Sequence, residues 1–266
     1  MDLQLGNKHI LITGGSKGIG LASAHAFLAE GARVAIVSRD AANLQRAAAQ
    51  LCDADPAAAS RIATYCADTS HAGQALAALE QAQRAGGPID VLVNSAGAAR
   101  RTPVHELTPQ SWADAMQAKY FACVYMLDAV IKHMAQRGSG AIVNVIGAGG
   151  KVASSIHLAG GAANAALMLV TAGLATTYAP KGVRVNAVNP GLTLTERLHE
   201  GIAADARAQG VSTEQALQSA QARLPLGRIA KPEEIAAAVL FLASPRASYI
   251  SGAILAMDGA VTPIVV

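Results

Sequence analysis

A glycine-rich turn near the amino terminus has the residue types and spacing of a phosphate-binding loop. It runs from Thr13 to Gly20, reads TGGSKGIG, and joins an apolar segment to a helical one. Glycines permit the tight turn and let backbone N–H groups approach a pyrophosphate, while the following helix start supplies a positive dipole. The context therefore predicts a dinucleotide site, against the alternative of a glycine turn without a ligand. The residues of the turn that we expect to contact the cofactor are Gly14, Ser16, Lys17, Gly18, Ile19 and Gly20.

The residues that end the second apolar segment indicate which dinucleotide is preferred. An acidic side chain at this point would bind the ribose 2′-hydroxyl of NAD and repel the 2′-phosphate of NADP. Ser38 occupies the position here, and Arg39 follows it. Arg39 and Lys17 would place two cations around a 2′-phosphate, where charge-assisted hydrogen bonds are strong. NADP(H) is therefore favoured over NAD(H), the alternative being that both are solvated surface cations near Asp40.

These residues must be positioned by a sheet, because short β-branched segments alternate along the chain with Ala-rich helical segments. The predicted strands are His9–Thr13, Arg33–Val37, Ile62–Cys66, Val91–Asn94, Ala141–Ile146, Val183–Val188 and Ala253–Met257. The predicted helices are Ile19–Glu30, Ala41–Leu51, Gly73–Arg84, Ser111–Gln136, Ala159–Tyr178 and Pro232–Ala243. Right-handed crossovers then give an α/β fold with a doubly wound, seven-stranded, Rossmann-like parallel sheet. No linker or repeat divides residues 1–266, so we expect one dinucleotide-binding domain.

The composition argues against several other classes of protein. With 266 residues, 52% hydrophobic and 15% charged, the chain can bury one large core, which argues against disorder. The net charge of +3 includes no run of Lys or Arg, so neither a nucleic acid nor a membrane surface is an expected partner. The three cysteines form no C-x-x-C pair, so neither disulfides nor a metal site is expected. No signal peptide or apolar stretch of bilayer length is evident, and we expect a cytoplasmic protein with a small-molecule substrate.

Motifs spread from about Leu5 to Ala260 resemble those of the short-chain dehydrogenase/reductase family. The glycine turn resembles that family's cofactor motif, and the segment 94–97 resembles its Asn-Asn-Ala-Gly sequence. Segments 184–186, 189–191, 225–228 and 251–259 resemble signatures of its second half, and residues 196–224 resemble its substrate lid. The resemblance implies an oxidoreductase acting on a carbonyl or secondary alcohol. It extends the expected cofactor site to Asp68, Asn94, Ala96, Gly97, Pro190, Gly191, Thr193 and Thr195.

The Tyr-x-x-x-Lys motif that carries the chemistry in this family is absent. None of the five tyrosines is followed by a lysine four positions later. Counting back from Asn186 places the family's lysine at Asn164, its tyrosine at Gly160 and its serine at Gly147. The fourth catalytic position of the family, an asparagine, falls on Lys119. All four catalytic positions have therefore changed.

Two of the changes are reciprocal and suggest a replacement for the lost groups. The family's Asn position holds Lys119 and its Lys position holds Asn164, on helices that pack together in this fold. Either a cation moved across the site, or drift left a snorkelling lysine and a capping amide. His157, three residues before Gly160, is the substitute acid or base, because an unperturbed histidine pKa suits neutral pH; the alternative is a solvated bystander. We therefore expect His157, Lys119 and Asn164 to be catalytic.

Gly160 and Gly161 stand in the first turn of a helix, where each costs roughly 1 kcal/mol relative to Ala. At Gly160 the absence of a tyrosine ring leaves room for a larger substrate or for a proton donor from elsewhere. At Gly161 we expect close helix packing at a subunit interface. The Ala-rich segments 111–136 and 159–178 resemble the family's dimer interface, and the apolar tail 261–266 favours burial against a neighbour. We expect a homotetramer or homodimer, although the alanines could instead pack inside one subunit.

Three functions remain open on the sequence. The first is an NADP-dependent oxidoreductase in which His157 or Lys119 transfers the proton. The second is an NADP-binding protein without redox turnover, serving as a sensor or an assembly partner. The third is a lyase or isomerase that uses the same pocket.

Overall fold

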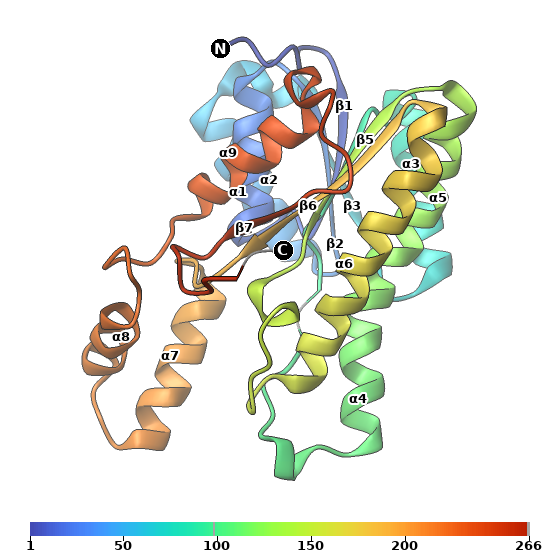
Figure 1. Ribbon diagram of the computed structural model, residues 1–266. Helices are drawn as coiled ribbons and strands as arrows, with labels where there is room; N and C mark the ends of the chain where they lie inside the picture. Colours follow the sequence, from blue (N-terminus) through green and yellow to red (C-terminus); the bar gives the residue numbers. More distant parts are fainter. Residues whose placement is uncertain (98, 265–266) are drawn as a thin grey trace.

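The computed structural model describes residues 1–97 and 99–264, and they form one parallel sheet covered by helices (Figure 1). The strands follow the order β3-β2-β1-β4-β5-β6-β7, and every neighbouring pair is parallel. Their bounds are β1 His9–Thr13, β2 Arg33–Ser38, β3 Ile62–Cys66, β4 Val91–Asn94, β5 Gly140–Val145, β6 Val183–Pro190 and β7 Ile254–Met257. All seven predicted strands are thus present. The order reverses between β1 and β4, and in such sheets ligands bind at the carboxyl ends of the strands beside this point.

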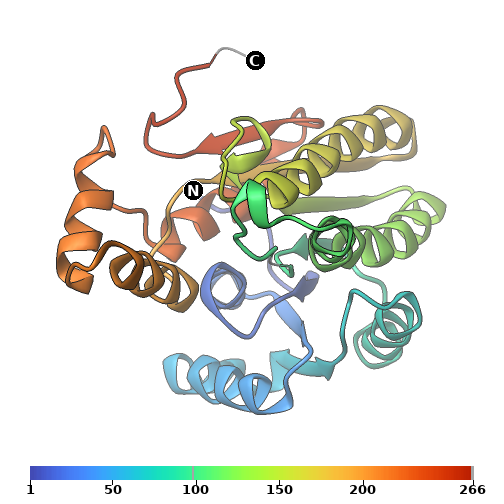
Figure 2. The ribbon, with the colours of Figure 1, turned by 90° about the horizontal axis from the view of Figure 1, so that it is seen from below.

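The helices form one layer on each face of the sheet, as Figure 2 shows end-on. The layer of α1, α2 and α9 packs on one core cluster, and the layer of α3, α5 and α6 packs on the other. The bounds of these six helices are α1 Gly18–Ala29, α2 Ala41–Ala54, α3 Ala72–Gly86, α5 Ala122–Arg137, α6 Leu158–Tyr178 and α9 Pro232–Ala243. The central strands are buried on both faces for this reason, which explains their nearly continuous apolar sequences.

The predicted helix 111–136 is in fact three consecutive segments. The α-helix α4 spans Pro109–Ala115, a π-helical turn η3 spans Met116–Phe121, and α5 continues from Ala122. Turns of π-helix are rare and are frequent at functional sites, because the extra residue redirects the side chains of that turn. The turn contains Lys119, the only residue of the segment that is both charged and buried.

The segment that resembles a substrate lid contains two helices, α7 Glu196–Gln209 and α8 Thr213–Ala222. Each helix begins at a hydroxyl cap, provided by Thr195 and by Ser212. The two helices pack on each other and share a small apolar cluster of their own. They extend beyond the carboxyl ends of the strands, at the same end of the molecule as α4 (Figure 1).

Helix α6 corrects the prediction that no apolar stretch approaches bilayer length. With the short turn that follows it, residues 158–181 are long and apolar enough to cross a membrane by length and composition alone. One face of α6, including Leu167 and Thr171, is instead buried against the sheet. The opposite face carries small residues and Leu169, and it is exposed. α6 is therefore a core helix with one uncovered face.

A buried chain of hydrogen bonds crosses the middle of the sheet and ends on α6. The Thr13 hydroxyl donates to Asn94 Oδ1 over 3.4 Å, and Asn94 Nδ2 donates to Asn144 Oδ1 over 3.0 Å. Asn144 Nδ2 in turn donates to Thr171 Oγ1 over 3.0 Å, and that hydroxyl donates to the Leu167 carbonyl over 2.8 Å. The chain thereby links β1, β4, β5 and α6 just before the strands end.

Candidate active site

The glycine turn between β1 and α1 is shaped to receive a ligand closely. Gly14 and Gly18 have left-handed φ angles of 67° and 52°, which favour glycine. A Cβ on Gly14 would lie 2.8 Å from the Ala96 Cα, and a Cβ on Gly20 would overlap the Gly14 carbonyl. Among the described residues, no side chain caps the N-terminus of α1, so its first N–H groups are available to a phosphate. The turn therefore fits the pyrophosphate of a dinucleotide.

A cavity of about 430 Å³ lies beside this turn, between it, α2 and the start of α7. It is lined by Ser16, Lys17, Gly18, Leu21, Asn43, Arg46, Ala47, Gln50 and Glu196. Ser16 Oγ donates to Ser38 Oγ over 2.9 Å, which fixes the end of β2 against the turn. Lys17 Nζ forms an ion pair with Glu196 Oε2 at 2.7 Å, and the lysine holds the pKa of that carboxyl below its usual range. Lys17, which we predicted to bind a phosphate, is thus paired with the first residue of the segment that resembles a lid.

Other predicted cofactor residues are already bonded within the chain. The Asp68 carboxylate accepts hydrogen bonds from the Ser70 backbone N–H and hydroxyl, at 2.9 and 2.7 Å. Thr195 Oγ1 accepts from the Leu198 N–H as the cap of α7, and the Thr193 hydroxyl donates to the Gly191 carbonyl. These bonds are the turn and helix capping that such residues commonly provide. Contacts of these side chains with a cofactor remain predictions.

Lys119 reaches from the π-helical turn to the end of β5. Its Nζ donates to the Val145 carbonyl over 3.1 Å, and only 8% of the residue is exposed. The approach needs glycine at 97, where φ is 105° and a Cβ would lie 2.6 Å from the Ala118 carbonyl and 3.4 Å from Lys119 Cδ. Gly97, in the segment that resembles Asn-Asn-Ala-Gly, thus leaves room for the Lys119 side chain.

The environment of Lys119 changes its acidity. Burial lowers the pKa of the ammonium to about 8, while the nearby Cys123 raises it and the cation of Arg197 lowers it further. A lysine pKa in this range is suited to proton transfer near neutral pH, unlike the ordinary value of about 10.4.

Asn164 reaches the same strand end from α6. Its Nδ2 donates to the Gly147 carbonyl over 3.5 Å, a long hydrogen bond, and its buried Oδ1 has no partner among the described residues. The predicted packing of the two helical segments is confirmed, because α6 contacts the π-helical turn that carries Lys119. The two exchanged residues therefore meet at residues 145–147, with an amide oxygen left to accept one further hydrogen bond.

The imidazole of His157 fills the space beside Gly160. A Cβ on Gly160 would overlap His157 Cε1 and Nε2 and would lie 2.8 Å from the Ala99 Cβ. The ring also contacts the position that a Cβ on Gly149 would take, 3.3 Å from His157 Cδ2. A tyrosine at 160 is therefore incompatible with the observed position of His157.

The expectation of an unperturbed His157 is wrong. Burial, followed by the cations of Arg101, Arg197 and Lys119, lowers the pKa of the imidazole. The ring is consequently neutral at neutral pH, and its buried Nδ1 has no hydrogen-bond partner among the described residues. A neutral imidazole can orient a bound group by a hydrogen bond or accept a proton, but beside the cation of Lys119 it is a poor proton donor.

Gly161 makes a close contact within its own subunit, and its expected role at a subunit interface stays a prediction. A Cβ on Gly161 would lie 2.6 Å from the Gly149 carbonyl, in the short 3₁₀ turn η4 (Ala148–Gly150). The glycine therefore lets this turn lie directly on α6 within one subunit, so a subunit interface is not needed to explain it.

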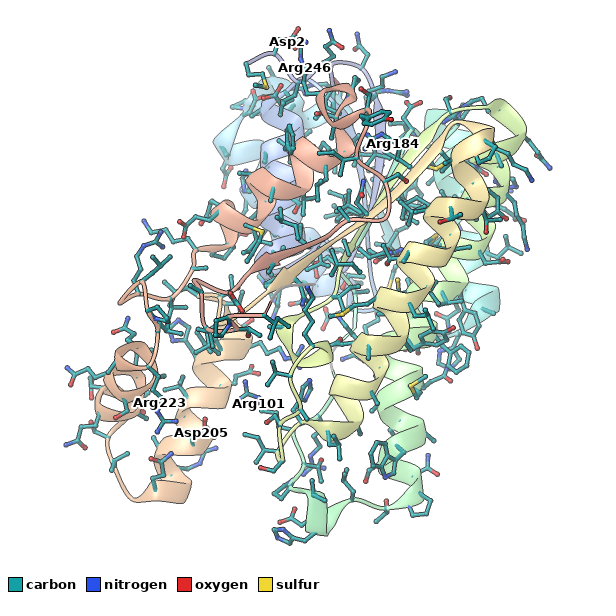
Figure 3. The ribbon with its side chains drawn as sticks, viewed as in Figure 1. Asp2, Arg101, Arg184, Asp205, Arg223 and Arg246 are labelled. Atoms are coloured by element: carbon teal, nitrogen blue, oxygen red, sulfur yellow. The ribbon has the colours of Figure 1, made fainter. Side chains whose placement is uncertain are left out.

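Two arginines near His157, Arg101 and Arg197, were not anticipated from the sequence. Arg197 Nη2, in the first turn of the lid helix α7, donates to the Ala99 carbonyl over 3.0 Å. Arg101 Nη1 lies 3.9 Å from Asp205 Oδ2, and Figure 3 shows this arginine beside α7. The sequence signal was slight, since two arginines after segment 94–97 and one in a polar helix are ordinary surface residues.

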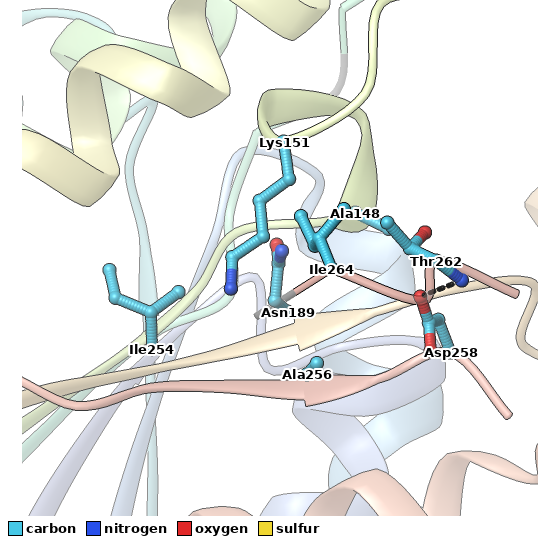
Figure 4. A pocket seen from close by; sticks show the side chains of 8 residues that line it. All are labelled: Ala148, Lys151, Asn189, Ile254, Ala256, Asp258, Thr262 and Ile264. Carbon is cyan, nitrogen blue, oxygen red and sulfur yellow. Dashed lines mark hydrogen bonds between the residues drawn. The ribbon is translucent and has the colours of Figure 1, made fainter. Parts of the chain in front are cut away.

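A second cavity, of about 350 Å³, lies beside η4 (Figure 4). Its lining residues are Ala148, Lys151, Asn189, Ile254, Ala256, Asp258, Thr262 and Ile264. Lys151 extends over it from η4, and the Thr262 N–H donates to Asp258 Oδ2 over 3.1 Å. Part of the apolar tail therefore packs on its own subunit, although Ile264 remains 45% exposed.

Comparison with known proteins gives consistent relatives. A family model described as enoyl-(acyl carrier protein) reductase matches residues 14–262. D-threitol dehydrogenase of Mycolicibacterium smegmatis is 38% identical over 264 residues, covering 98% of this chain and 95% of the relative. The structure of L-sorbose reductase from Gluconobacter frateurii with NADPH and L-sorbose aligns with a TM-score of 0.92, at 30% identity and full coverage of both chains.

A further solved structure is similar to this chain. It is an NADPH-bound short chain oxidoreductase from Pseudomonas aeruginosa PAO1, described as containing an atypical catalytic center. It aligns with a TM-score of 0.88 at 32% identity, covering 98% of this chain and all of the other.

We expect Lys119→Met to make the protein more stable at pH 7. The decrease of the Lys119 pKa from 10.5 to about 8 means that charging the buried amine costs about 3 kcal/mol in the folded state. Loss of the hydrogen bond to the Val145 carbonyl offsets about 1 kcal/mol of the gain. Urea unfolding should show a net gain of about 1 to 2 kcal/mol, with exposed Lys8→Met as the neutral control.

The pH dependence of the stability tests the direction of the Lys119 pKa shift independently. Between pH 8 and 10.5 the unfolded chain keeps the Lys119 proton that the folded chain has lost, so wild-type stability gains with rising pH relative to the variant. The advantage of Lys119→Met should therefore shrink over that window. A variant that is less stable than wild type at pH 7 would show that the lysine is not buried in its charged form.

Proposed function

The chain belongs to the short-chain dehydrogenase/reductase family, and on that premise we propose that it is an NADP(H)-dependent oxidoreductase with non-standard catalytic residues. Its reaction interconverts a carbonyl and a secondary alcohol on a small molecule. The observation that carries the proposal is Lys119, a buried amine with a pKa of about 8 at the carboxyl end of β5.

The glycine turn supplies the binding of the cofactor. Gly14, Gly18 and Gly20 leave room for the pyrophosphate, and the N-terminus of α1 favours its charge. When bound there, NADPH supplies the hydride that reduces the carbonyl carbon. The chain's own residues must then bind the substrate oxygen, exclude water and deliver one proton.

We assign the proton to Lys119. At pH 7 its ammonium is mostly protonated, and transfer to the alkoxide that develops during reduction leaves a neutral amine, which burial favours. Asn164 Oδ1 would accept a hydrogen bond from the product hydroxyl or from a water, since this oxygen otherwise lacks a partner among the described residues. Neutral His157 would border the substrate and orient it. All three residues replace functions that the Ser, Tyr and Lys of the family provide.

A cofactor-binding protein without turnover is the second candidate. His157 packs into the position that the family's tyrosine would need, and a protein released from redox chemistry could tolerate the same arrangement. The two candidates differ in whether Lys119 transfers a proton.

The remaining proposals concern the assembly and setting of the enzyme. Residues 1–266 form a single dinucleotide-binding domain in which residues 196–224 act as the substrate lid, closed by the Lys17–Glu196 ion pair. We place the protein in the cytoplasm. We further propose a homotetramer, or at least a homodimer, because the exposed face of α6 combines Ala162, Ala165 and 76% exposed Leu169.

We expect NADPH-linked turnover with ketones that depends on Lys119. In Lys119→Ala, kcat for reduction should fall by about 10²- to 10⁴-fold, the usual contribution of a general acid, with little change in NADPH affinity. In wild type the reduction rate should fall as pH rises through about 8, and alcohol oxidation should rise, because the two directions need opposite protonation states of Lys119. Stopped-flow NADPH absorbance measures both, with Lys8→Ala as the control.

A gain-of-function variant tests the opposite case. Combining Gly160→Tyr and Asn164→Lys requires His157→Ser as well, because the imidazole overlaps the site of a side chain at 160. If the triple variant reduces ketones while wild type binds NADPH and remains inert with a broad ketone panel, the non-redox candidate is correct.

We expect NADPH to bind at least several-fold more tightly than NADH. Arg39→Ala should weaken the binding of NADPH but not that of NADH. The exposed Arg39 cation lies at the end of β2, where Ser38 stands in place of a carboxylate that would repel the 2′-phosphate. Glu196→Gln should strengthen NADPH binding by releasing Lys17. Titration calorimetry with both cofactors measures these affinities, with exposed Arg207→Ala as the control; equal affinities for NADPH and NADH would contradict the assignment.

We expect Leu169→Glu to lower the oligomeric state. The substitution places a charge on the exposed face of α6, where an interface would have to bury it. Multi-angle light scattering at micromolar concentration should show dimers or tetramers for wild type and smaller species for the variant. Leu226→Glu, at a 65% exposed position just after the lid, should leave the mass unchanged; a monomeric wild type would refute the interface.

A further inference from the structure

Arg101 and Arg197 connect the lid to the loop after β4, near His157. Arg197 donates to the Ala99 carbonyl from the lid helix α7, while Arg101 follows Ala99 in the loop and faces Asp205 of α7 at 3.9 Å. Ala99 itself lies against the space beside Gly160 that the His157 ring fills. The two guanidinium groups therefore lie near His157, one contributed by the lid and one by the loop after β4.

Among the residues that the structure describes, acidic groups do not balance the cations around His157. The cations of Arg101, Arg197 and Lys119 all act on His157, and Arg197 also acts on Lys119 and is acted on by Arg101. Against these three cations stand Asp205, at the long distance of 3.9 Å, and Glu200, which acts on Arg197. Glu196, the remaining acidic residue at this end of α7, is paired with Lys17.

Such an arrangement is unfavourable without an anionic partner. Cations that lie within one another's field repel, and Arg197 has also lost part of its hydration, since burial lowers the pKa of its guanidinium. The buried Nδ1 of His157 adds a polar atom without a partner among the described residues. A neutral, apolar substrate would cover these groups without offering any of them a hydrogen-bond acceptor, so the loss of their hydration would not be compensated.

Resting on the oxidoreductase function proposed above, we infer that the substrate carries an oxyanion, a carboxylate or a phosphate, which Arg101 and Arg197 bind while its carbonyl lies at Lys119. Guanidinium groups match both oxyanions through paired hydrogen bonds. Arg101 is half-exposed and can turn from its long contact with Asp205 toward a ligand. Binding would also link α7 to the loop after β4 through the substrate, so the lid closes on the charged molecule.

Matched substrates that differ in one charge test the inference. Levulinate is compared with methyl levulinate, and dihydroxyacetone phosphate with dihydroxyacetone, in NADPH oxidation by the intact protein. We expect at least a tenfold higher kcat/KM for one charged member than for its neutral partner, and the pair that shows it identifies carboxylate or phosphate. Arg101→Gln and Arg197→Gln should each lower kcat/KM for the charged member about tenfold or more, mainly through KM, and change the neutral one less than threefold.

Two further variants separate charge recognition from a structural role. Arg197→Lys keeps the cation and should keep most of the preference, while Arg207→Gln, at an exposed position near the other end of α7, should behave as wild type. If the Gln variants impair charged and neutral substrates equally, the arginines only support the lid and the inference is overturned. It is also overturned if wild type reduces the neutral ketones as well as the charged ones, an outcome that leaves the proposed function intact.

Direct binding distinguishes failure of the site from failure of the chemistry. Levulinate and inorganic phosphate are titrated by calorimetry into protein saturated with NADP⁺. Binding to wild type that is lost in Arg197→Gln supports the anion site even if no compound oxidises NADPH, in which case the redox proposal alone fails. Absence of both binding and turnover overturns the two proposals together.

Discussion

A buried chain of hydrogen bonds from Thr13 to Thr171 sets the positions on which the rest of the site depends. It fastens β1, β4 and β5 to α6 through two asparagine amides that have no access to water. A slip of one strand would leave at least one buried amide without a partner, which costs about 1 to 3 kcal/mol for each group. The ends of these strands therefore stay in register, and they carry the glycine turn, Gly97 and the Val145 carbonyl.

The sheet and the glycine turn could be predicted because their physical signals are local. Strands buried on both faces, such as Ile142 to Val145, must be apolar throughout, and the closeness of Gly20 to Gly14 admits no side chain. Other features depend on contacts between distant segments. The π-helical turn at Lys119 packs on α6, and Gly161 is explained by the carbonyl of Gly149; a periodic pattern reveals neither contact.

The chemistry of the site was less predictable than its location. The positions of Lys119, Asn164 and His157 around the end of β5 agree with the expectation that they share one site. The protonation states do not follow from sequence, because they are set by burial and by nearby cations from distant segments, such as Arg101 and Arg197. A buried amine and two buried polar atoms without partners in the described part of the chain are features that lower stability, and proteins retain such features chiefly at functional sites.

The position of the His157 ring also limits how this protein could evolve. Return to the family's usual tyrosine by a single Gly160→Tyr substitution would force the new side chain into the imidazole, so the first step would disrupt the fold locally before any benefit appeared. Loss of His157 first would open a gap beside Gly149 and Gly160. Either order of substitution therefore passes through a poorly packed intermediate. The residues at 157 and 160 are therefore sterically coupled, so a tyrosine at 160 requires both positions to change together.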